Sequence, residues 1–264
     1  MTRHPFLFAA HALVWVCTHA GAQDAPPLGL SGTLGAGAMN IPTYEGSPNR
    51  RSVVVPDLSL VYRTESAGTV EMGPRGLIWN LLGDRPGKLG LVGAYDPGRK
   101  TKKTSAGDPT PGDRRLAGMG DVRSTAEAGV LVGYGPLSAM YRRALGDRGH
   151  RGAQLDLLAE WPMELAERVG LRLTAGATWA DTRYQQATFG VTAVQSGASG
   201  FKVFTPRSGL RKVDLGVGVE YRFADQWKLQ SSFGWTQLTG DAADSPIVSD
   251  KGGATAYAGI VHGF

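Results

Sequence analysis

Apolar and polar residues alternate with a period of two along most of the chain. In residues 169–179 the odd positions hold Val, Leu, Leu, Ala, Ala and Trp, whereas the even positions hold Gly, Arg, Thr, Gly and Thr. Residues 213–223 and 227–235 repeat this separation on either side of a short turn. Because successive side chains of a β-strand point to opposite faces, the period predicts strands, and it pairs these last two in a hairpin.

Weaker alternation predicts further strands, and their number depends on one region. The alternation in residues 69–82 is interrupted at Gly73-Pro74, and counting two strands there gives a total of twelve. If one of the weak N-terminal segments is not a strand, the expected total is ten. Residues 162–168 are predicted to be a connection and are the best helical candidate, and no helix longer than a turn or two is required. The predicted strands are 28–39, 53–63, 69–73, 76–82, 88–96, 124–134, 137–145, 154–161, 169–179, 213–223, 227–235 and 254–264.

Three features indicate a transmembrane antiparallel β-barrel rather than a soluble one. Short and long connections alternate, as periplasmic turns alternate with extracellular loops in outer-membrane barrels. Phe264 ends an amphipathic last strand and resembles the signal that the barrel-assembly machinery reads. Aromatic residues lie at predicted strand ends, as they do at membrane interfaces; they are Trp161, Trp179, Tyr221, Phe223, Trp227 and Trp235. Unpaired backbone groups are costly in hydrocarbon, so the all-β sheet is expected to close.

The N-terminus predicts export to the cell outer membrane. Arg3 and His4 precede an apolar stretch at 6–16, and Ala20-Gly21-Ala22 has the form of a cleavage site, so residues 1–22 are predicted to be a signal peptide. Residues 23–264 then form one barrel domain. The only cysteine, Cys17, lies in the signal, which leaves neither a disulfide nor a thiolate site in the mature chain.

The net charge of +5 is concentrated in one predicted extracellular loop. Four cations lie close together there: Arg99, Lys100, Lys102 and Lys103. Two interpretations are open. The cations either contact an acidic surface, such as the phosphates of lipopolysaccharide, or belong to a solvated loop that binds nothing. Nucleic acid is excluded as a partner because an exported barrel without interleaved aromatic residues lacks a platform for bases.

Residue types argue against an enzyme, a cofactor or a metal. The mature chain keeps only His150 and His262, and no activated nucleophile is identifiable beside Asp147 and His150, which are predicted to lie at a solvated hairpin tip. The loop 239–253 contains three aspartates, but they lack the regular spacing of a calcium loop, and its Gly-Asp, Ser-Pro and Gly-Gly pairs are typical of turns.

Several short motifs resemble the MipA/OmpV family of outer-membrane proteins. Besides the C-terminal Phe264, they are PTYEGS (42–47), GMGDV (118–122), ATWAD (177–181) with FGVT (189–192), and a signature loop GDAADSPIV that begins with Gly240, Asp241, Ala242, Ala243, Asp244, Ser245 and Pro246. The resemblance covers nearly the whole mature chain. His262 in the last strand and the basic run 99–103 depart from the family pattern.

The resemblance implies a scaffold in peptidoglycan assembly that joins a murein lytic transglycosylase to a penicillin-binding protein. Such partners would dock on the small periplasmic surface, at residues 23–27 and the short turns. A diffusion pore and a surface adhesin are the alternatives. The inward-facing side chains suit both an open polar lumen and one closed by salt bridges; they are Arg63, Arg172, Asp214, Glu220, Arg222, Lys228 and Gln230.

Overall fold

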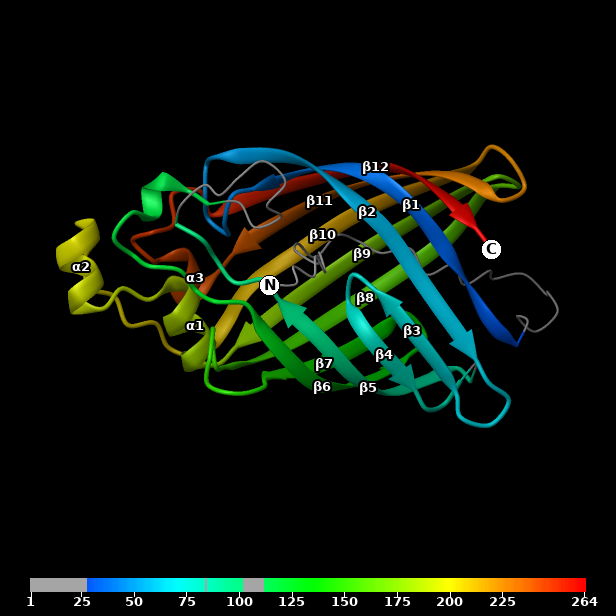
Figure 1. Cartoon of the computed structure of the whole chain (residues 1–264), viewed down its shortest axis with the longest axis horizontal. Coiled ribbons are helices and arrows are strands. Elements are labelled where there is room, and N and C mark those ends of the chain that lie inside the picture. Colours follow the sequence, from blue (N-terminus) through cyan, green and yellow to red (C-terminus); the bar gives the residue numbers. More distant parts are fainter. Residues whose placement is uncertain (1–27, 84, 102–111) are drawn as a thin grey trace, which may run out of the picture.

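The computed structural model describes residues 28–83, 85–101 and 112–264, which form a closed barrel of twelve antiparallel strands (Figure 1). The predicted strand count is confirmed, including the division of residues 69–82. The strands are β1 (Gly29–Pro42), β2 (Arg50–Arg63), β3 (Thr69–Gly73), β4 (Gly76–Asn80), β5 (Gly87–Asp96), β6 (Thr125–Tyr134), β7 (Leu137–Ala144), β8 (Ala153–Ala166), β9 (Val169–Ala180), β10 (Gly209–Arg222), β11 (Trp227–Leu238) and β12 (Gly252–Gly263).

The barrel closes where β12 pairs with β1. Leu34 lies opposite His262, and Ala38 lies opposite Ala258. Beyond the last strand residue, the backbone N–H of Phe264 donates to the carbonyl of Gly32 at 3.0 Å, and the N–H of Gly32 donates to the carbonyl of Phe264 at 3.0 Å. The C-terminal residue is thus held in the closing seam. Its role as a signal for the barrel-assembly machinery stays a prediction.

Apolar side chains face outward and polar ones face the lumen, as in a membrane barrel. Half-exposed outward residues include Leu91, Leu215 and Phe233, whereas Glu127 and Arg142 are buried inside. None of the helices in the described ranges is long and apolar enough to cross a membrane. The period-two pattern therefore distinguishes the lipid face from the lumen face of this barrel.

Apart from the β3–β4 turn, which points toward the long loops but ends part-way along the wall, short turns gather at one end of the barrel and long loops at the other, as predicted (Figure 1). One prediction was wrong: residues 162–168 are not a separate connection, because β8 continues to Ala166 and pairs Pro162 with Arg172 of β9. Strand β7 pairs with β8 only as far as Leu137 opposite Ala159. Pro162 therefore lies on a strand edge, where its missing N–H costs no ladder hydrogen bond.

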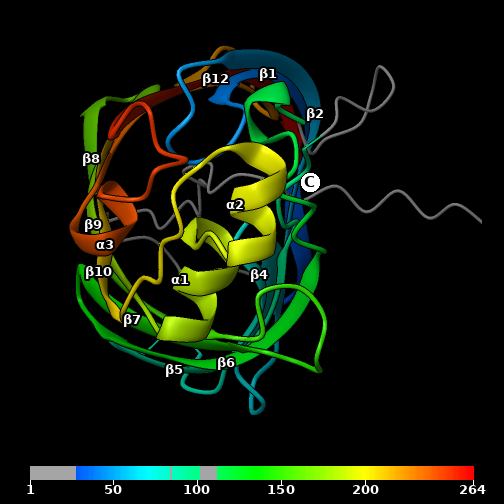
Figure 2. The same ribbon diagram turned by 90° about the vertical axis from the view of Figure 1, so that its left-hand side faces the viewer.

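The long loops form a cap over the extracellular mouth (Figure 2). The cap holds α1 (Thr182–Phe189), α2 (Ala193–Ser199), α3 (Gly240–Ala243) and a short 3-10 helix, η1 (Arg114–Leu116). Helix α1 begins where the carboxylate of Asp181 accepts the N–H of Tyr184 at 2.8 Å, and α2 begins with a capping box at Thr192. The helices therefore lie in the cap and not at residues 162–168.

The cap has an apolar core of its own, built from loops that are far apart in the sequence. Its members are Tyr44, Leu116, Met119, Val191 and Ile247, each no more than 8% exposed. A second cluster joins Phe189 to Leu238, Ala242 and Ala243. Because these side chains come from four different connections, the cap is a packed layer and not a set of independent loops.

Candidate functional site

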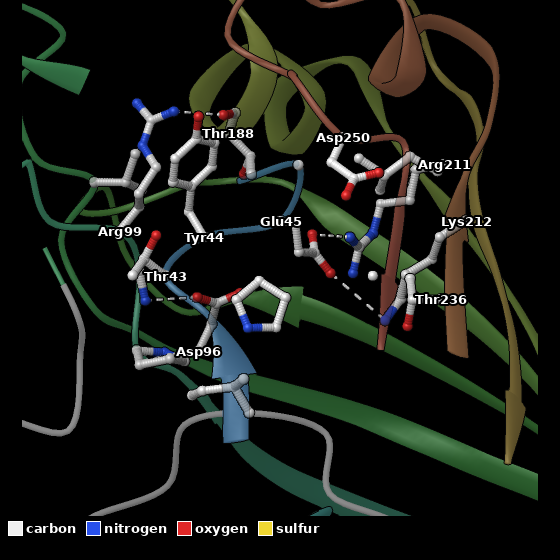
Figure 3. A pocket seen from close by; sticks show the side chains of 18 of the residues that line it. Thr43, Tyr44, Glu45, Asp96, Arg99, Thr188, Arg211, Lys212, Thr236 and Asp250 are labelled. Carbon is white, nitrogen blue, oxygen red and sulfur yellow. Dashed lines mark hydrogen bonds and ion pairs between the residues drawn. The ribbon is translucent and has the colours of Figure 1, made fainter. Parts of the chain in front are cut away.

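A cavity of about 240 Å³ lies between the cap and the lumen (Figure 3). The loop between β1 and β2 supplies Thr43, Tyr44 and Glu45, the end of β5 supplies Asp96, and β10 supplies Arg211 and Lys212. Glu45 points toward both cations of β10 (Figure 3). The cavity is therefore polar on the side where the barrel wall meets the cap.

A bulge in β10 explains why two consecutive cations are buried there. The register between β10 and β9 shifts between Leu210 and Lys212, so Arg211 and Lys212 both turn inward, at 1% and 5% exposure. Arg211 pairs with Glu45 and donates to Gln154 at 3.1 Å. The ammonium of Lys212 lies 3.5 Å from Glu45 and 3.4 Å from Asp214. These buried charges are thereby compensated.

Tyr184 of α1 ties the cap to this cluster. The guanidinium of Arg211 lies 5.0 Å from the centre of the Tyr184 ring, within the range of a cation–π contact. The Tyr184 hydroxyl donates to Asp96 at 3.3 Å. Burial raises the pKa of Tyr184 well above its ordinary value. The phenol therefore stays neutral and acts as a hydrogen-bond donor under the cap.

His150 does not lie at a solvated hairpin tip, because its side chain is only 1% exposed. Its Nδ1 accepts the N–H of Gly152 at 3.1 Å, which leaves the proton on Nε2, 3.2 Å from a carboxylate oxygen of Glu127. The ring also contacts Tyr184, with 4.7 Å between centroids. The loop turns inward here, and Arg151 takes a positive φ of 54°. Only Asp147 stays exposed as predicted.

Deeper in the lumen, Arg142 lies between two carboxylates. Its guanidinium is 2.6 Å from Glu127 and 2.7 Å from Asp156. Thr178 donates to Asp156 at 2.8 Å, and Gln154 donates to Glu127 at 3.3 Å. This network joins β6 to β9 across the inner face of the barrel. Nearer the periplasmic end, Arg172 pairs with Glu160 at 3.3 Å, and Lys228 pairs with Glu220 at 3.0 Å.

The predicted anion contact is not a single exposed cluster. Arg99 is 6% exposed and donates to the carbonyl of Thr188 at 2.8 Å, and burial lowers its pKa to about 10. It therefore stabilises the cap and is not available to a surface ligand. Lys100 forms a β-bridge with Gly112, and the predicted cations Lys102 and Lys103 lie outside the described residues. An anion contact through these three lysines stays a prediction.

The signature loop is built into the cap. Gly240 takes a φ of 51° at the start of α3, and the carboxylate of Asp241 accepts the N–H of Arg207 at 2.7 Å. Ala242, Ala243 and Ser245 are buried, and the Ser245 hydroxyl donates to the carbonyl of Phe189 at 2.5 Å. Asp244, which is exposed, pairs with Lys251 at 3.1 Å, and Pro246 is half-buried. Across the described ranges, no group of three or more His, Cys, Asp and Glu side chains is placed to hold a metal.

Asp113 fastens η1 to the loop between β1 and β2. Thr43 and Ser47 donate to its carboxylate at 2.6 and 2.8 Å, Asn49 donates at 3.1 Å, and the N–H of Arg115 donates at 2.9 Å. Burial opposes the charge, but these hydrogen bonds outweigh it and lower the pKa of Asp113. Its contribution to cap stability is therefore complete above the ordinary pKa of about 3.9 and is lost as the pH falls through the lower folded-state pKa.

We expect Asp113→Ala to destabilise the cap by about 1.5–3 kcal/mol, because it leaves several donors without their charged acceptor. The rate at which an added protease cuts the loops at pH 7 measures this loss. The exposed Asp147→Ala is the matched control and should leave that rate unchanged. An equal rate for Asp113→Ala and the unmodified protein would show that the carboxylate does not hold the cap.

Glu45, Tyr184 and Arg211 were not among the site residues predicted from the sequence. Signals exist for two of them: PTYEGS contains Glu45, and the consecutive cations Arg211 and Lys212 break the alternation at the start of β10, whereas no motif marks Tyr184. Neither signal specifies a partner, because the Arg211–Glu45 pair joins residues 166 positions apart. The inward orientation predicted for Arg172, Asp214, Glu220 and Lys228 agrees with the ion pairs of the lumen.

Comparison with known proteins agrees with the resemblance seen in the sequence. Two curated proteins named MltA-interacting protein, from Escherichia coli (strain K12) and Shigella flexneri, are each 24% identical over 194 residues, which cover 71% of this chain and 72% of the relative. An outer-membrane channel from Pseudomonas putida F1 matches with a TM-score of 0.41 and 13% identity, over 94% of this chain and 100% of the channel. OmpT of Vibrio cholerae matches with a TM-score of 0.38 and 10% identity, over 89% and 97%.

The TM-scores, both below 0.5, carry no functional argument. The decisive match is with the family model described as MltA-interacting protein MipA, which extends over residues 34–264. That range contains all the predicted motifs from PTYEGS to the last residue, Phe264. The chain therefore belongs to the MltA-interacting protein (MipA) family.

Proposed function

We propose that this barrel is a non-enzymatic scaffold of the outer membrane, which binds a murein lytic transglycosylase of the MltA type and joins it to a penicillin-binding protein. The observation that carries the proposal is membership of a family whose curated relatives are named for their interaction with MltA. A leader at residues 1–22 would deliver the chain to the envelope. The partners would meet it on the periplasmic side.

The lumen supports a scaffold over a diffusion pore. Arg142, Arg172 and Lys228 are each ion-paired with a carboxylate of the adjacent strand on the inner wall, and the cap lies over the extracellular mouth (Figure 2). An open pore needs a continuous water path, whereas this barrel presents paired charges and a packed layer of loops. The two ring nitrogens of His150 contact Gly152 and Glu127, which supports a structural role and not a catalytic one.

The β8–β9 hairpin is the best docking site that the periplasmic end offers. Residues 161–168 are exposed on both faces, so the hairpin extends past the lumen. Met163 and Leu165 are 38% and 62% exposed, and Glu164 and Glu167 lie beside them. Residues 161–166 pair with β9 but not with β7. An apolar strand edge with acidic neighbours can accept a further strand from a partner.

Site-directed crosslinking tests this proposal. Because the only cysteine, Cys17, lies in the proposed leader, Glu167→Cys would place one reactive thiol on the processed chain, at the hairpin. With a thiol-to-amine crosslinker in intact envelopes, we expect this variant to capture the transglycosylase, and the penicillin-binding protein to be recovered with it. Val194→Cys, on the 83% exposed Val194 of α2, is the matched control on the extracellular cap and should capture neither.

Three outcomes separate the parts of the proposal. Capture of both murein enzymes through residue 167 supports the scaffold. Capture of the transglycosylase alone would support binding but contradict the joining of two enzymes. Capture of neither through any periplasmic turn, in envelopes that contain both enzymes, would contradict the scaffold itself.

A further inference from the structure

A groove of about 870 Å³ lies at the extracellular end of the barrel, where three connections meet. Residues 119–123 of the loop between β5 and β6 form one wall, and residues 147–149 and 151 of the loop between β7 and β8 form another. Helix α1 lines a third side with residues 182, 183, 186 and 187. Figure 2 looks onto this end of the molecule. Among the described lining residues, the groove shares only Val122 with the cavity under the cap, so the two are separate sites.

Exposed arginines from all three walls line the groove. Among the described residues, none of their guanidinium groups forms an ion pair, whereas the inward cations of β7 and β10 are paired. Two carboxylates also line the groove, but Asp121 accepts hydrogen bonds from the N–H and the hydroxyl of Thr101 at 2.8 and 3.0 Å, and Asp147 is exposed. Positive charge therefore exceeds negative charge here, which favours an anion. The arginines are Arg123, Arg148, Arg151 and Arg183.

Close contacts hold the walls of the groove in place. Gly149 takes a φ of 69°, and a Cβ at this position would collide with the carbonyl of Arg123 and the hydroxyl of Thr125. The side-chain amide of Gln195 in α2 donates to the carbonyl of Met119 at 2.7 Å. The arginines thus project from loops that are already packed together, so little backbone ordering has to accompany the binding of a ligand.

The backbone of Arg151 is held in an unfavourable conformation. Its φ of 54° lies in the left-handed region, where every other positive φ among the described residues belongs to a glycine. Glycine would adopt this turn without strain, whereas arginine adds a guanidinium to the groove. Strain of this kind is concentrated at sites that hold a ligand. The outlier is therefore a second observation, independent of the charge, that points to a binding site.

The groove lies just beyond the lipid-facing wall. Leu145 continues the outward row of β7 and is 58% exposed, and Arg148 follows it by three residues. Arg123 precedes the first residue of β6 by two, and Arg183 follows the last residue of β9 by three. Three extended residues span about 10 Å at most, and the headgroup region of a leaflet is roughly 5–8 Å deep. The arginines therefore lie at or just above the headgroups of the outer leaflet.

The lining fits a phosphorylated saccharide better than a neutral one. A guanidinium forms two parallel hydrogen bonds with a phosphate, and several guanidinium groups can bind several phosphates at once. No aromatic side chain is found among the described lining residues, so the groove lacks a platform on which a sugar ring or a base could stack. Its volume lies near the upper end of the range for small-ligand pockets, about 300–1,000 Å³, and exceeds what one phosphate fills.

We propose that the groove binds the phosphorylated saccharide of lipopolysaccharide in the outer leaflet, with the four arginines on its phosphate groups. These arginines are different residues from the basic run 99–103, in which Arg99 is buried. The groove lies at the end of the barrel opposite the β8–β9 hairpin, so the inference does not depend on the scaffold proposed above. Binding attaches the cap to the leaflet around it.

Isothermal titration calorimetry of the barrel in dimyristoylphosphatidylcholine nanodiscs tests the groove. The probe is the oligosaccharide of rough lipopolysaccharide after complete deacylation, with its phosphates intact. We expect saturable binding that weakens at high salt, and an affinity about tenfold lower or more for the same oligosaccharide after removal of its phosphates with hydrofluoric acid. Equal affinity for the two forms would overturn the proposal.

Variants separate the groove from general surface charge. Arg148→Gln combined with Arg183→Gln should weaken binding of the phosphorylated oligosaccharide about tenfold or more, because two guanidinium contacts are lost. Arg114→Gln combined with Arg143→Gln removes two exposed arginines that do not line the groove. This matched control should keep the affinity within about twofold of the unmodified protein. Equal losses in the two double variants would contradict a site in the groove.

A single variant covers the case in which the double groove variant does not fold, as judged by heat-modifiable migration. Arg151→Gly relieves the strained turn and removes one guanidinium, so it should fold and still weaken binding about threefold or more. An unchanged affinity in this folded variant would count against the proposal.

Nanodiscs that contain intact lipopolysaccharide test the source of the ligand. Headgroups in the disc should already occupy the groove, so the added oligosaccharide should bind about tenfold more weakly than in pure phosphatidylcholine discs. Equal binding in the two kinds of disc would show that the headgroups do not reach the groove, and the assignment to lipopolysaccharide would be wrong.

Discussion

We expect Arg142→Leu to lower the free energy of unfolding by about 3–5 kcal/mol. Arg142 is 5% exposed and contacts Glu127 and Asp156 at once. Its removal leaves two carboxylates in the lumen without their shared cation, and uncompensated buried charge is far more costly than a lost surface pair. Urea titration of the refolded barrel, followed by tryptophan fluorescence, measures the change.

The adjacent Arg143→Leu is the matched control, because Arg143 is exposed and its loss should cost less than about 1 kcal/mol. Combining Arg142→Met with Glu127→Gln and Asp156→Asn removes all three charges together. This triple variant should recover more than half of the free energy of unfolding that Arg142→Leu loses. A cost below about 1 kcal/mol for Arg142→Leu alone would show that water reaches these carboxylates, and hence that the lumen is open.

The strands could be predicted because one rule governs their whole length. In β10, each residue from Val213 to Arg222 faces either lipid or lumen, and the two environments select opposite side chains. Even the short β3 and β4 were predicted, because Gly73-Pro74 is a turn signal in the chain itself. The prediction of a connection at residues 162–168 was wrong because proline usually ends a strand. Pro162 is tolerated inside β8 because β7 stops pairing with β8 at Ala159, which the sequence does not show.

The site could not be predicted in the same way, because its contacts join distant loops. Arg99 belongs to a basic run whose members look alike in sequence, yet it is buried against the carbonyl of Thr188, 89 residues away. Glu45 and Arg211 are separated by 166 residues. Alternation says which face of a strand a side chain occupies, but it contains no information about which loop folds over that face.

Within the signature loop, we expect substitution of Ile247 to destabilise the cap most. Ile247 follows Pro246 and is 1% exposed in the core of the cap. We expect Ile247→Asp to destabilise the cap by about 4 kcal/mol or more, because it removes a buried side chain and places a charge in an apolar cluster. The Tyr44 hydroxyl donates to the carbonyl of Ile247 at 2.8 Å. The loop between β1 and β2 should therefore loosen together with the signature loop.

Protease added to intact cells should cut the variant in its loops, while the barrel keeps its heat-modifiable migration. Ser249→Asp introduces the same charge at an exposed position two residues away and is the matched control. Loss of the whole barrel would instead mean that cap and wall fold as one unit. Cutting of the loops alone would show that the family motif stabilises the cap and not the barrel wall. Because the cap lies at the end of the barrel opposite the β8–β9 hairpin, the Ile247→Asp variant should then still capture murein enzymes through residue 167.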